Sequence, residues 1–349
     1  MKDTQKGMSR RDFAQASTVA AGALGAMRLA GAEKAASGIK LGLYSITYLG
    51  VWYRGDALSL EQVVQRAKQF GYQGVEIDGK RPHGDPLDMP KARCRELRKF
   101  AQGQGIEIYA VAGNNDFSSP IPEFREAQLL YMRELIRMSA DLEAKIVRVF
   151  LAWPGVTRVP GGGARYDVAK QIWEATHKEF SPEQTWEWCR EGLRETAKYA
   201  SDFGVTLALQ NHAPVIKSYP DMLRMIREVD SPNLKACFDA RLEHELGPKE
   251  IVSATREVGP LQVLSHYGNE YSEQDGRIVL KEDENITAQV EGLMEIGYNG
   301  YLGFELCHPL PVVNGQLVGL DYADRNARLA AQSLRDTIAE VKKKRAAKT

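Results

Sequence analysis

The chain has 349 residues, of which 43% are hydrophobic and 26% are charged, as in an ordinary globular protein. Lysine and arginine total 46, aspartate and glutamate also total 46, and the formal net charge is zero. Because phosphate backbones bind to surplus cationic surface, this balance argues against nucleic acid as the main partner.

The first 32 residues have the features of an export leader. The twin arginines Arg10 and Arg11 precede Phe13, and a weakly apolar run rich in Ala and Gly follows. This run ends at Ala30-Gly31-Ala32, a small-x-small site that a signal peptidase could cut. We therefore expect a Tat signal peptide over residues 1–32, a periplasmic location and a folded domain over residues 33–349. The run is too short and too rich in alanine for a membrane span. The alternative to a signal peptide is a disordered tail in which two arginines are adjacent by chance.

From Ile39 onward, short β-rich runs alternate with longer amphipathic segments. The expected strands are Lys40–Ile46, Gly74–Asp78, Glu107–Ala112, Ile146–Ala152, Thr206–Asn211, Ala236–Asp239, Gln262–His266 and Tyr301–Leu306. The expected helices include Leu60–Phe70, Ala92–Gln102, Arg125–Ala140, Pro182–Phe203, Asp221–Val229 and Arg325–Lys344. Eight strands alternating with helices predict a (β/α)₈ TIM barrel. A doubly wound sheet is disfavoured because no glycine-rich turn follows the first strand.

One connection is longer than the others. Residues 155–181 contain Pro160 followed by Gly161, Gly162 and Gly163. The glycines are not a phosphate-binding P-loop, because no Gly-Lys-Ser/Thr follows them. We expect either a mobile lid over the barrel mouth or a plain surface insertion.

Metal-competent side chains end four successive predicted strands. They are Gln210, Asp239, His266 and Glu305. Barrel enzymes carry their catalytic groups at the carboxyl ends of the strands, so we expect these four side chains to hold one divalent ion. Oxygen donors with one imidazole suit Mn²⁺, Mg²⁺, Co²⁺ or Zn²⁺. Such an ion has room for two substrate oxygens, and a vicinal hydroxy-ketone would fit them, with its carbonyl polarised by the metal.

The sequences Leu-Ala-Leu-Gln-Asn-His, Phe-Asp and Gly-Phe-Glu around Gln210, Asp239 and Glu305 resemble the xylose isomerase-like barrel superfamily. This superfamily includes sugar phosphate isomerases and epimerases, ketose 3-epimerases, inosose dehydratases and endonuclease IV. Residues 71–76, Gly-Tyr-Gln-Gly-Val-Glu, are similar to its second-strand entry. The resemblance covers nearly the whole mature chain and implies that Gln210, Asp239, His266 and Glu305 form the metal shell.

Two positions depart from the pattern of the epimerases. They usually have Glu at the position of Gln210, and two opposed glutamates then exchange the substrate proton. Glutamine can ligate a metal through its carbonyl oxygen, but it cannot act as a base. Glu305 therefore remains the expected base, and His212 is either the second acid/base or a hydrogen-bond partner of the substrate. Leu242 stands where the epimerases carry His.

Further side chains are expected near the mouth as substrate contacts. They are Glu76, Asn114, Trp153, His212, Tyr267 and His308. Glu76 could instead form a buried salt bridge, and Trp153 could instead pack under the lid. The remaining histidines, His83, His177 and His244, are expected at the surface. The four cysteines, Cys94, Cys189, Cys237 and Cys307, are expected as small core residues.

The sequence thus predicts a divalent-metal-dependent sugar isomerase or epimerase, acting on a free sugar or keto-sugar through an enolate or enediolate. A lyase or hydratase of the same fold acting on a 3-keto-glycoside is the first alternative. A non-catalytic sugar-binding or partner subunit is the alternative from another class. An endonuclease is disfavoured because the chain has only six histidines and no net charge. We expect a small-molecule sugar as partner and leave a homo-oligomer open.

Overall fold

The computed structural model describes residues 38–159, 163–281 and 285–347. The predicted Tat leader, Pro160 and the first two glycines of the predicted lid lie outside these ranges. Within them, no helix has the length and apolar character that a membrane crossing requires.

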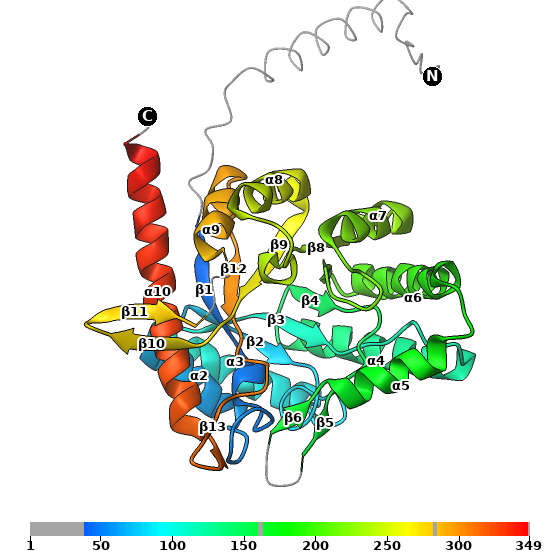
Figure 1. Ribbon diagram of the computed structural model, residues 1–349. Helices are drawn as coiled ribbons and strands as arrows, with labels where there is room; N and C mark the ends of the chain where they lie inside the picture. The colour runs from blue at the N-terminus through cyan, green and yellow to red at the C-terminus, as the bar shows by residue number, and fades with distance from the viewer. Residues whose placement is uncertain (1–37, 160–162, 282–284, 348–349) are drawn as a thin grey trace, which may run out of the picture. The chain divides into compact units, whose positions relative to one another are not determined.

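Eight parallel strands close into a barrel, which confirms the predicted (β/α)₈ fold (Figure 1). They are β1 (Lys40–Tyr44), β2 (Gly74–Asp78), β3 (Glu107–Gly113), β4 (Ile146–Val149), β7 (Thr206–Gln210), β8 (Leu234–Cys237), β9 (Gln262–Tyr267) and β12 (Tyr301–Phe304). Their order around the barrel is β1-β12-β9-β8-β7-β4-β3-β2. The first and last strands close it, in a register that pairs Lys40 with Tyr301 and Leu43 with Phe304.

Helices surround the barrel (Figure 1). They are α2 (Leu60–Phe70), α3 (Lys91–Gln104), α4 (Pro122–Asp141), α5 (Asp167–His177), α6 (Pro182–Asp202), α7 (Tyr219–Val229), α8 (Pro248–Val258), α9 (Ile286–Glu295) and α10 (Leu320–Ala346). Local chemistry sets their ends: Ser59 and Gln62 form a capping box at the start of α2, and Gly71, with φ of 79°, ends it. The apolar faces of the helices cover the outward-facing residues of the strands, and this layer is the main hydrophobic core.

A second, smaller apolar cluster fills the barrel interior. It contains the rings of Tyr109 and Tyr301, which stack with centroids 4.0 Å apart, together with Ala208 and Leu264. Gly42 on β1 makes room for this stack, because a Cβ atom at position 42 would lie 2.4 Å from Tyr109 Oη. The polar residues of the strands lie beyond this apolar cluster, toward the carboxyl ends of the strands.

We expect Gly42→Ala to destabilise the fold by about 1–3 kcal/mol, because the stacked tyrosines must shift to admit a methyl group. Gly103→Ala on α3 is the matched control, since a Cβ there meets no atom within 4 Å. That change is expected to stabilise the protein by about 0.4–1 kcal/mol. Urea unfolding of both variants measures the difference, and equal midpoints would show that the tyrosine stack has room for a methyl group at position 42.

The long connection after β4 is more regular than predicted. It contains the hairpin β5–β6 (Thr157–Arg158 and Ala164–Arg165) and helix α5, which the sequence analysis did not identify. Hairpin β10–β11 (Tyr271–Gln274 and Arg277–Leu280) packs against α10, and β13–β14 (Val312–Val313 and Gln316–Leu317) precedes that helix. Three short 3₁₀ turns, η1 (Ser45–Tyr48), η2 (Ala240–Leu242) and η3 (Gly259–Leu261), complete the described elements.

Two histidines expected at the surface are buried. The ring nitrogens of His83 lie 3.0 Å from Ser45 Oγ and 2.9 Å from the Leu58 carbonyl oxygen. His177 Nε2 lies 2.8 Å from the Ser118 carbonyl oxygen. Their polar neighbours in sequence concealed these partners, which come from distant parts of the chain. The cysteines lie close to expectation: three are buried, Cys307 is half-buried, and all four are free thiols.

Candidate active site at the barrel mouth

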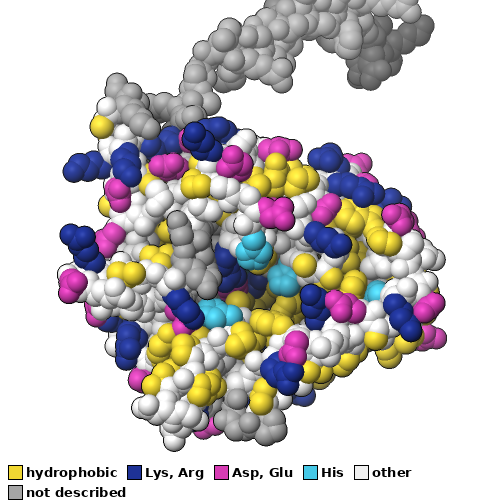
Figure 2. Space-filling model, viewed as in Figure 1, with side chains coloured by type: hydrophobic (Ala, Val, Ile, Leu, Met, Phe, Trp, Pro, Cys, Tyr) yellow, Lys and Arg dark blue, Asp and Glu magenta, His cyan; other side chains and the backbone are white. Residues whose placement is uncertain are grey.

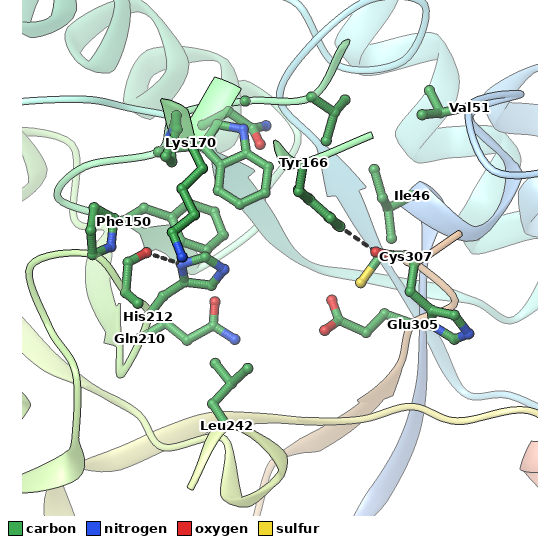
Figure 3. Close-up of a pocket in the computed structure, with 18 of the residues that line it drawn as sticks. Ile46, Val51, Phe150, Tyr166, Lys170, Gln210, His212, Leu242, Glu305 and Cys307 are labelled. Carbon is green, nitrogen blue, oxygen red and sulfur yellow. Dashed lines mark hydrogen bonds between the residues drawn. The ribbon is translucent and has the colours of Figure 1, made fainter. Parts of the chain in front are cut away.

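A cavity of about 570 Å³ opens at the carboxyl ends of the strands. Figure 2 shows a hollow in this face, with hydrophobic side chains inside it and histidine, lysine and arginine side chains around it. Six of the residues predicted from the sequence line the cavity: Asn114, Trp153, Gln210, His212, Glu305 and His308. In Figure 3 the Gln210 amide and the Glu305 carboxylate face each other across it.

The other predicted residues do not line the cavity. Glu76, Asp239 and His266 are buried. Glu76 and Asp239 contact the cavity-lining residues Arg148 and Gln210, whereas His266 contacts Glu76 behind them. Tyr267 lies elsewhere, in the core between barrel and helices, with its ring 5.5 Å from that of Phe304. The period of two along β9 explains this, because His266 faces the barrel interior and its neighbour must face outward. The expected substrate contact of Tyr267 is corrected accordingly.

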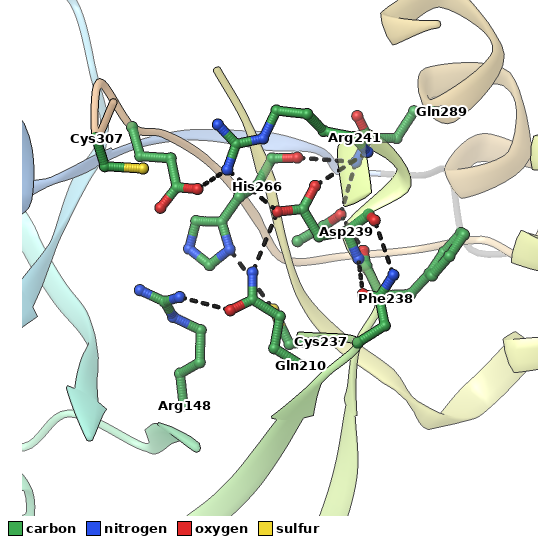
Figure 4. Close-up of polar contacts among 12 residues, drawn as sticks. Arg148, Gln210, Cys237, Phe238, Asp239, Arg241, His266, Gln289 and Cys307 are labelled. Carbon is green, nitrogen blue, oxygen red and sulfur yellow. Dashed lines mark hydrogen bonds and ion pairs between the residues drawn. The ribbon is translucent and has the colours of Figure 1, made fainter. Parts of the chain in front are cut away.

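The centre of the site is a residue that the sequence analysis missed. Arg148 on β4 is 1% exposed, and its Nε donates to Glu76 Oε1 at 2.7 Å. Its Nη1 donates to Gln210 Oε1 at 2.8 Å (Figure 4). Burial alone would raise the pKa of the Glu76 carboxyl, but Arg148 and His266 beside it lower that pKa to about 2. Glu76 is thus the buried salt-bridge partner that the sequence analysis held open.

His266 has both ring nitrogens engaged. Its Nε2 lies 2.6 Å from Glu76 Oε2, and because an ionised carboxylate only accepts, Nε2 carries the proton. Its Nδ1 lies 3.5 Å from Cys237 Sγ. Burial raises the pKa of the Cys237 thiol well above its usual value, so the S–H group donates to Nδ1. Burial also lowers the pKa of His266, which is consistent with a neutral ring.

A second guanidinium lies among the remaining predicted metal ligands. Arg241, from turn η2, forms an ion pair with Glu305, and its Nη2 lies 3.5 Å from Asp239 Oδ2 (Figure 4). The Asp239 carboxylate also accepts from Gln210 Nε2 at 3.1 Å and from the Arg241 backbone N–H at 3.1 Å. The four predicted ligands therefore lie in one connected network, but cationic side chains hold it together.

This arrangement does not fit a divalent ion. The Gln210 oxygen accepts from Arg148, the His266 nitrogens contact Glu76 and Cys237, and the Glu305 carboxylate pairs with Arg241. Across the described ranges, no three His, Cys, Asp or Glu side chains are grouped so that they could hold a metal. The metal centre stays a prediction from the sequence.

His212, just beyond β7, presents one nitrogen to the cavity. Its Nδ1 lies 2.6 Å from the Ala213 carbonyl oxygen, which can only accept, so Nδ1 carries the proton of the neutral ring. No described residue forms a hydrogen bond with Nε2, whose lone pair is therefore available to a ligand. Phe150 and Trp153 hold the ring edge-on, at centroid distances of 4.9 and 5.2 Å.

Burial lowers the pKa of His212 to about 4. We expect its ring to stay neutral down to about that pH, whereas a histidine in the unfolded chain becomes protonated at a pH of about 6.5. The unfolded chain then binds more protons between these two values, so lowering the pH through this window disfavours the folded state. NMR titration of the ring Cε1–H, assigned with His212→Asn, measures this; a midpoint near 6.5 would contradict the burial of the ring.

Aromatic side chains form much of the cavity wall. They are Tyr44, Trp52, Phe150, Trp153, Tyr166 and Trp173. Trp153 packs edge-on against Tyr166 of the long connection, with ring centroids 6.0 Å apart, and it also lines the cavity. Its position therefore fits both expected roles, a substrate contact and packing under the connection. The connection covers part of the mouth, since Val156, Tyr166 and Trp173 line the cavity. Whether it moves as a lid stays a prediction.

Two predicted contact residues are held by acidic partners. Asn114 Nδ2 donates to Asp78 Oδ1 at 2.5 Å, and His308 Nε2 lies 3.3 Å from Glu270 Oε1. His244, expected at the surface, is exposed and also borders the cavity.

One sequence signal could have identified Arg148. In Ile-Val-Arg-Val, the valines face outward into the helix layer, so the period of two places the arginine inside the barrel. A charged side chain in a barrel interior requires a partner of opposite charge. No comparable periodicity marks Arg241, which lies in a short turn after its strand.

Comparisons with known proteins agree with the fold. The family described as xylose isomerase-like TIM barrel matches residues 64–336. The fructoselysine 3-epimerases of Escherichia coli O157:H7 and Shigella flexneri are each 23% identical over 261 residues, which cover 71% of this chain and 86% of theirs. D-psicose 3-epimerase from Clostridium cellulolyticum H10 aligns with a TM-score of 0.63 at 20% identity, over 86% of this chain and 99% of that one. L-ribulose 3-epimerase has a TM-score of 0.63 at 16% identity, over 89% and 98%.

Proposed function

Because the chain belongs to the xylose isomerase-like TIM barrel family, we propose that it is an isomerase- or epimerase-type enzyme acting on a free sugar or keto-sugar through an enediolate. The observation that carries this proposal is the placement of Glu305 and His212 in one aromatic-lined cavity at the carboxyl end of the barrel. The matched relatives that are named as epimerases of sugars or sugar derivatives support the substrate class.

Glu305 is the proposed carbon base. Its carboxylate takes the proton from the carbon beside the substrate carbonyl, the C–H electrons form the carbon–carbon double bond, and the carbonyl electrons move to oxygen. His212 Nε2 accepts the proton of the neighbouring hydroxyl. For isomerisation, Glu305 returns its proton to the former carbonyl carbon, and His212 returns its proton to the former carbonyl oxygen. The carbonyl has then moved by one carbon, and every proton is accounted for without a metal ion.

Epimerisation makes a different demand on these groups. The proton must return to the opposite face of the enediolate, so a second acid has to supply it. Gln210, which faces Glu305 across the cavity (Figure 3), cannot supply a proton in place of a carboxylic acid. His212 Nε2 carries no proton before the reaction, and the proton that it takes from the substrate hydroxyl must return to oxygen. The described residues therefore favour transfer between adjacent carbons.

A 3-keto-glycoside lyase or hydratase is the second candidate. The cavity of about 570 Å³, with its aromatic walls, has room for a sugar and an attached group. A single carboxylate base is sufficient for β-elimination, because the proton leaves from C2 and the C1 oxygen leaves with its electron pair. The predicted leader adds the proposal that the enzyme works in the periplasm.

Incubation with ketoses, aldoses and 3-keto-glucosides in D₂O tests these proposals. Isomerisation is expected to leave glycosides intact and to introduce deuterium beside the carbonyl, to the extent that the proton on Glu305 exchanges with D₂O while the enediolate is bound. Release of the aglycone would identify the lyase instead. Binding of sugars with neither deuterium uptake nor conversion to an isomer in any of them would support the non-catalytic alternative and overturn the enediolate mechanism.

A further inference from the structure

Arg148 has one nitrogen that the fold does not use. The Glu76 and Gln210 contacts engage Nε and Nη1, whereas Nη2 is buried and has no hydrogen-bond partner among the described residues. An unsatisfied N–H on a buried guanidinium costs free energy, unless a ligand completes it. Arg148 is also one of the residues that line the cavity.

The surroundings hold this guanidinium in place. Its carbon Cζ lies 4.6 Å from the ring centroid of Tyr44 and 4.9 Å from that of Phe150. Two aromatic faces and two hydrogen bonds fix the direction of the third nitrogen before any substrate arrives. Because the aromatic rings exclude water, a hydrogen bond from this nitrogen is stronger than one made in solvent.

Gln210 places no negative charge beside the Arg148 guanidinium. An amide oxygen accepts from Nη1 without adding a negative charge, so Glu76 is the one carboxylate bonded to Arg148 among the described residues. A glutamate at position 210 would place a second carboxylate on the same guanidinium and weaken its attraction for a developing oxyanion. Glutamine in place of the glutamate usual in the epimerases thus preserves the positive charge of the neighbouring Arg148.

We propose that the Arg148 guanidinium, rather than a divalent ion, is the electrophile of this site, and that Nη2 donates a hydrogen bond to the carbonyl oxygen of the keto-sugar. This inference rests on the proposed enediolate chemistry. As Glu305 removes the carbon-bound proton, negative charge moves to the carbonyl oxygen, where the guanidinium stabilises it. When the proton returns, the charge leaves that oxygen and Arg148 is unchanged. Arg148 is therefore a catalytic residue that touches the reacting carbonyl.

The first test compares deuterium uptake by the wild-type protein after exhaustive chelation with uptake after addition of Mn²⁺, Mg²⁺, Co²⁺ or Zn²⁺. Equal rates in the chelated and supplemented protein are expected. Uptake that requires a metal would overturn the role of Arg148 and leave the enediolate proposal intact. Absence of uptake in every state would instead overturn the enediolate proposal, and the inference with it.

The second test uses Arg148→Lys, which keeps a charge for Glu76 but lacks the forked geometry. We expect its kcat to fall by about 10²–10³-fold. Arg66→Lys is the control, because Arg66 is half-buried and ion-paired with Asp324 but does not line the cavity. An Arg148→Lys variant that folds and turns over at the wild-type rate would contradict the proposal.

A third measurement does not depend on turnover. In a Glu305→Gln background, the infrared band of a ¹³C-labelled substrate carbonyl is expected at lower wavenumber than in the same background with Arg148→Lys. An identical band position in the two proteins would show that Arg148 does not touch the carbonyl. If the arginine variants fail to fold, the chelation experiment on the wild-type protein still decides between guanidinium and metal.

Discussion

Glu76→Gln is expected to destabilise the folded protein by about 3–5 kcal/mol, the typical cost of removing one partner from a buried ion pair. Glu76 and Arg148 are both almost completely buried and lie 2.7 Å apart. Without the carboxylate, Arg148 becomes a buried cation with no ionic partner among the described residues, since Gln210 is neutral. Urea unfolding of the purified protein, extrapolated to water, measures the change.

Two further variants make this prediction specific to the buried pair. Glu340→Gln changes an exposed carboxylate paired with Lys344 on α10, and the unfolding midpoint is expected to stay the same. The double variant Glu76→Gln/Arg148→Met is expected to recover much of the lost stability, because no unpaired charge remains. A single Glu76→Gln variant as stable as the wild type would show that water or another group compensates Arg148.

Glu305→Gln is expected to lower kcat by about 10²–10⁴-fold, because the amide cannot take a proton from carbon. Sugar binding should be retained, since the side chain keeps its size and polarity, so the loss is expected in kcat rather than in KM. Steady-state kinetics on a substrate identified by deuterium uptake measures it, with Glu340→Gln as the control. Activity within tenfold of the wild type would exclude Glu305 as the base.

The barrel was predictable because its signals are local. The strands are short, mostly apolar runs that are buried on both faces, such as Glu107–Gly113, and glycines such as Gly71 end the helices. The predicted strand Gly74–Asp78 and helix Leu60–Phe70 have the same bounds in the structure. Helix α5 was missed because the neighbouring glycines and Pro160 suggested a loop, although a helix begins only a few residues later.

The contents of the site were less predictable, because they depend on contacts between distant strands. The sequence placed Gln210, His212 and Glu305 at one end of the barrel, and all three line one cavity. It did not reveal that Arg148 would reach Glu76, 72 positions away. The chemistry expected of a ligand set changes when guanidinium groups lie among the ligands, and this is visible only once the strands are assembled.

The choice of substrate and the chemistry of the reaction depend on different parts of the chain, the connection between β4 and α6 and the barrel itself. Val156, Tyr166, Lys170 and Trp173, all from this connection, border the cavity, whereas Glu305 and Arg148 belong to the barrel. Mutations or length changes in this segment can therefore reshape the compartment that selects the guest molecule while the rigid scaffold preserves the reactive groups. Paralogues with the same inner barrel and different connections would be expected to share a reaction and differ in the molecules they accept.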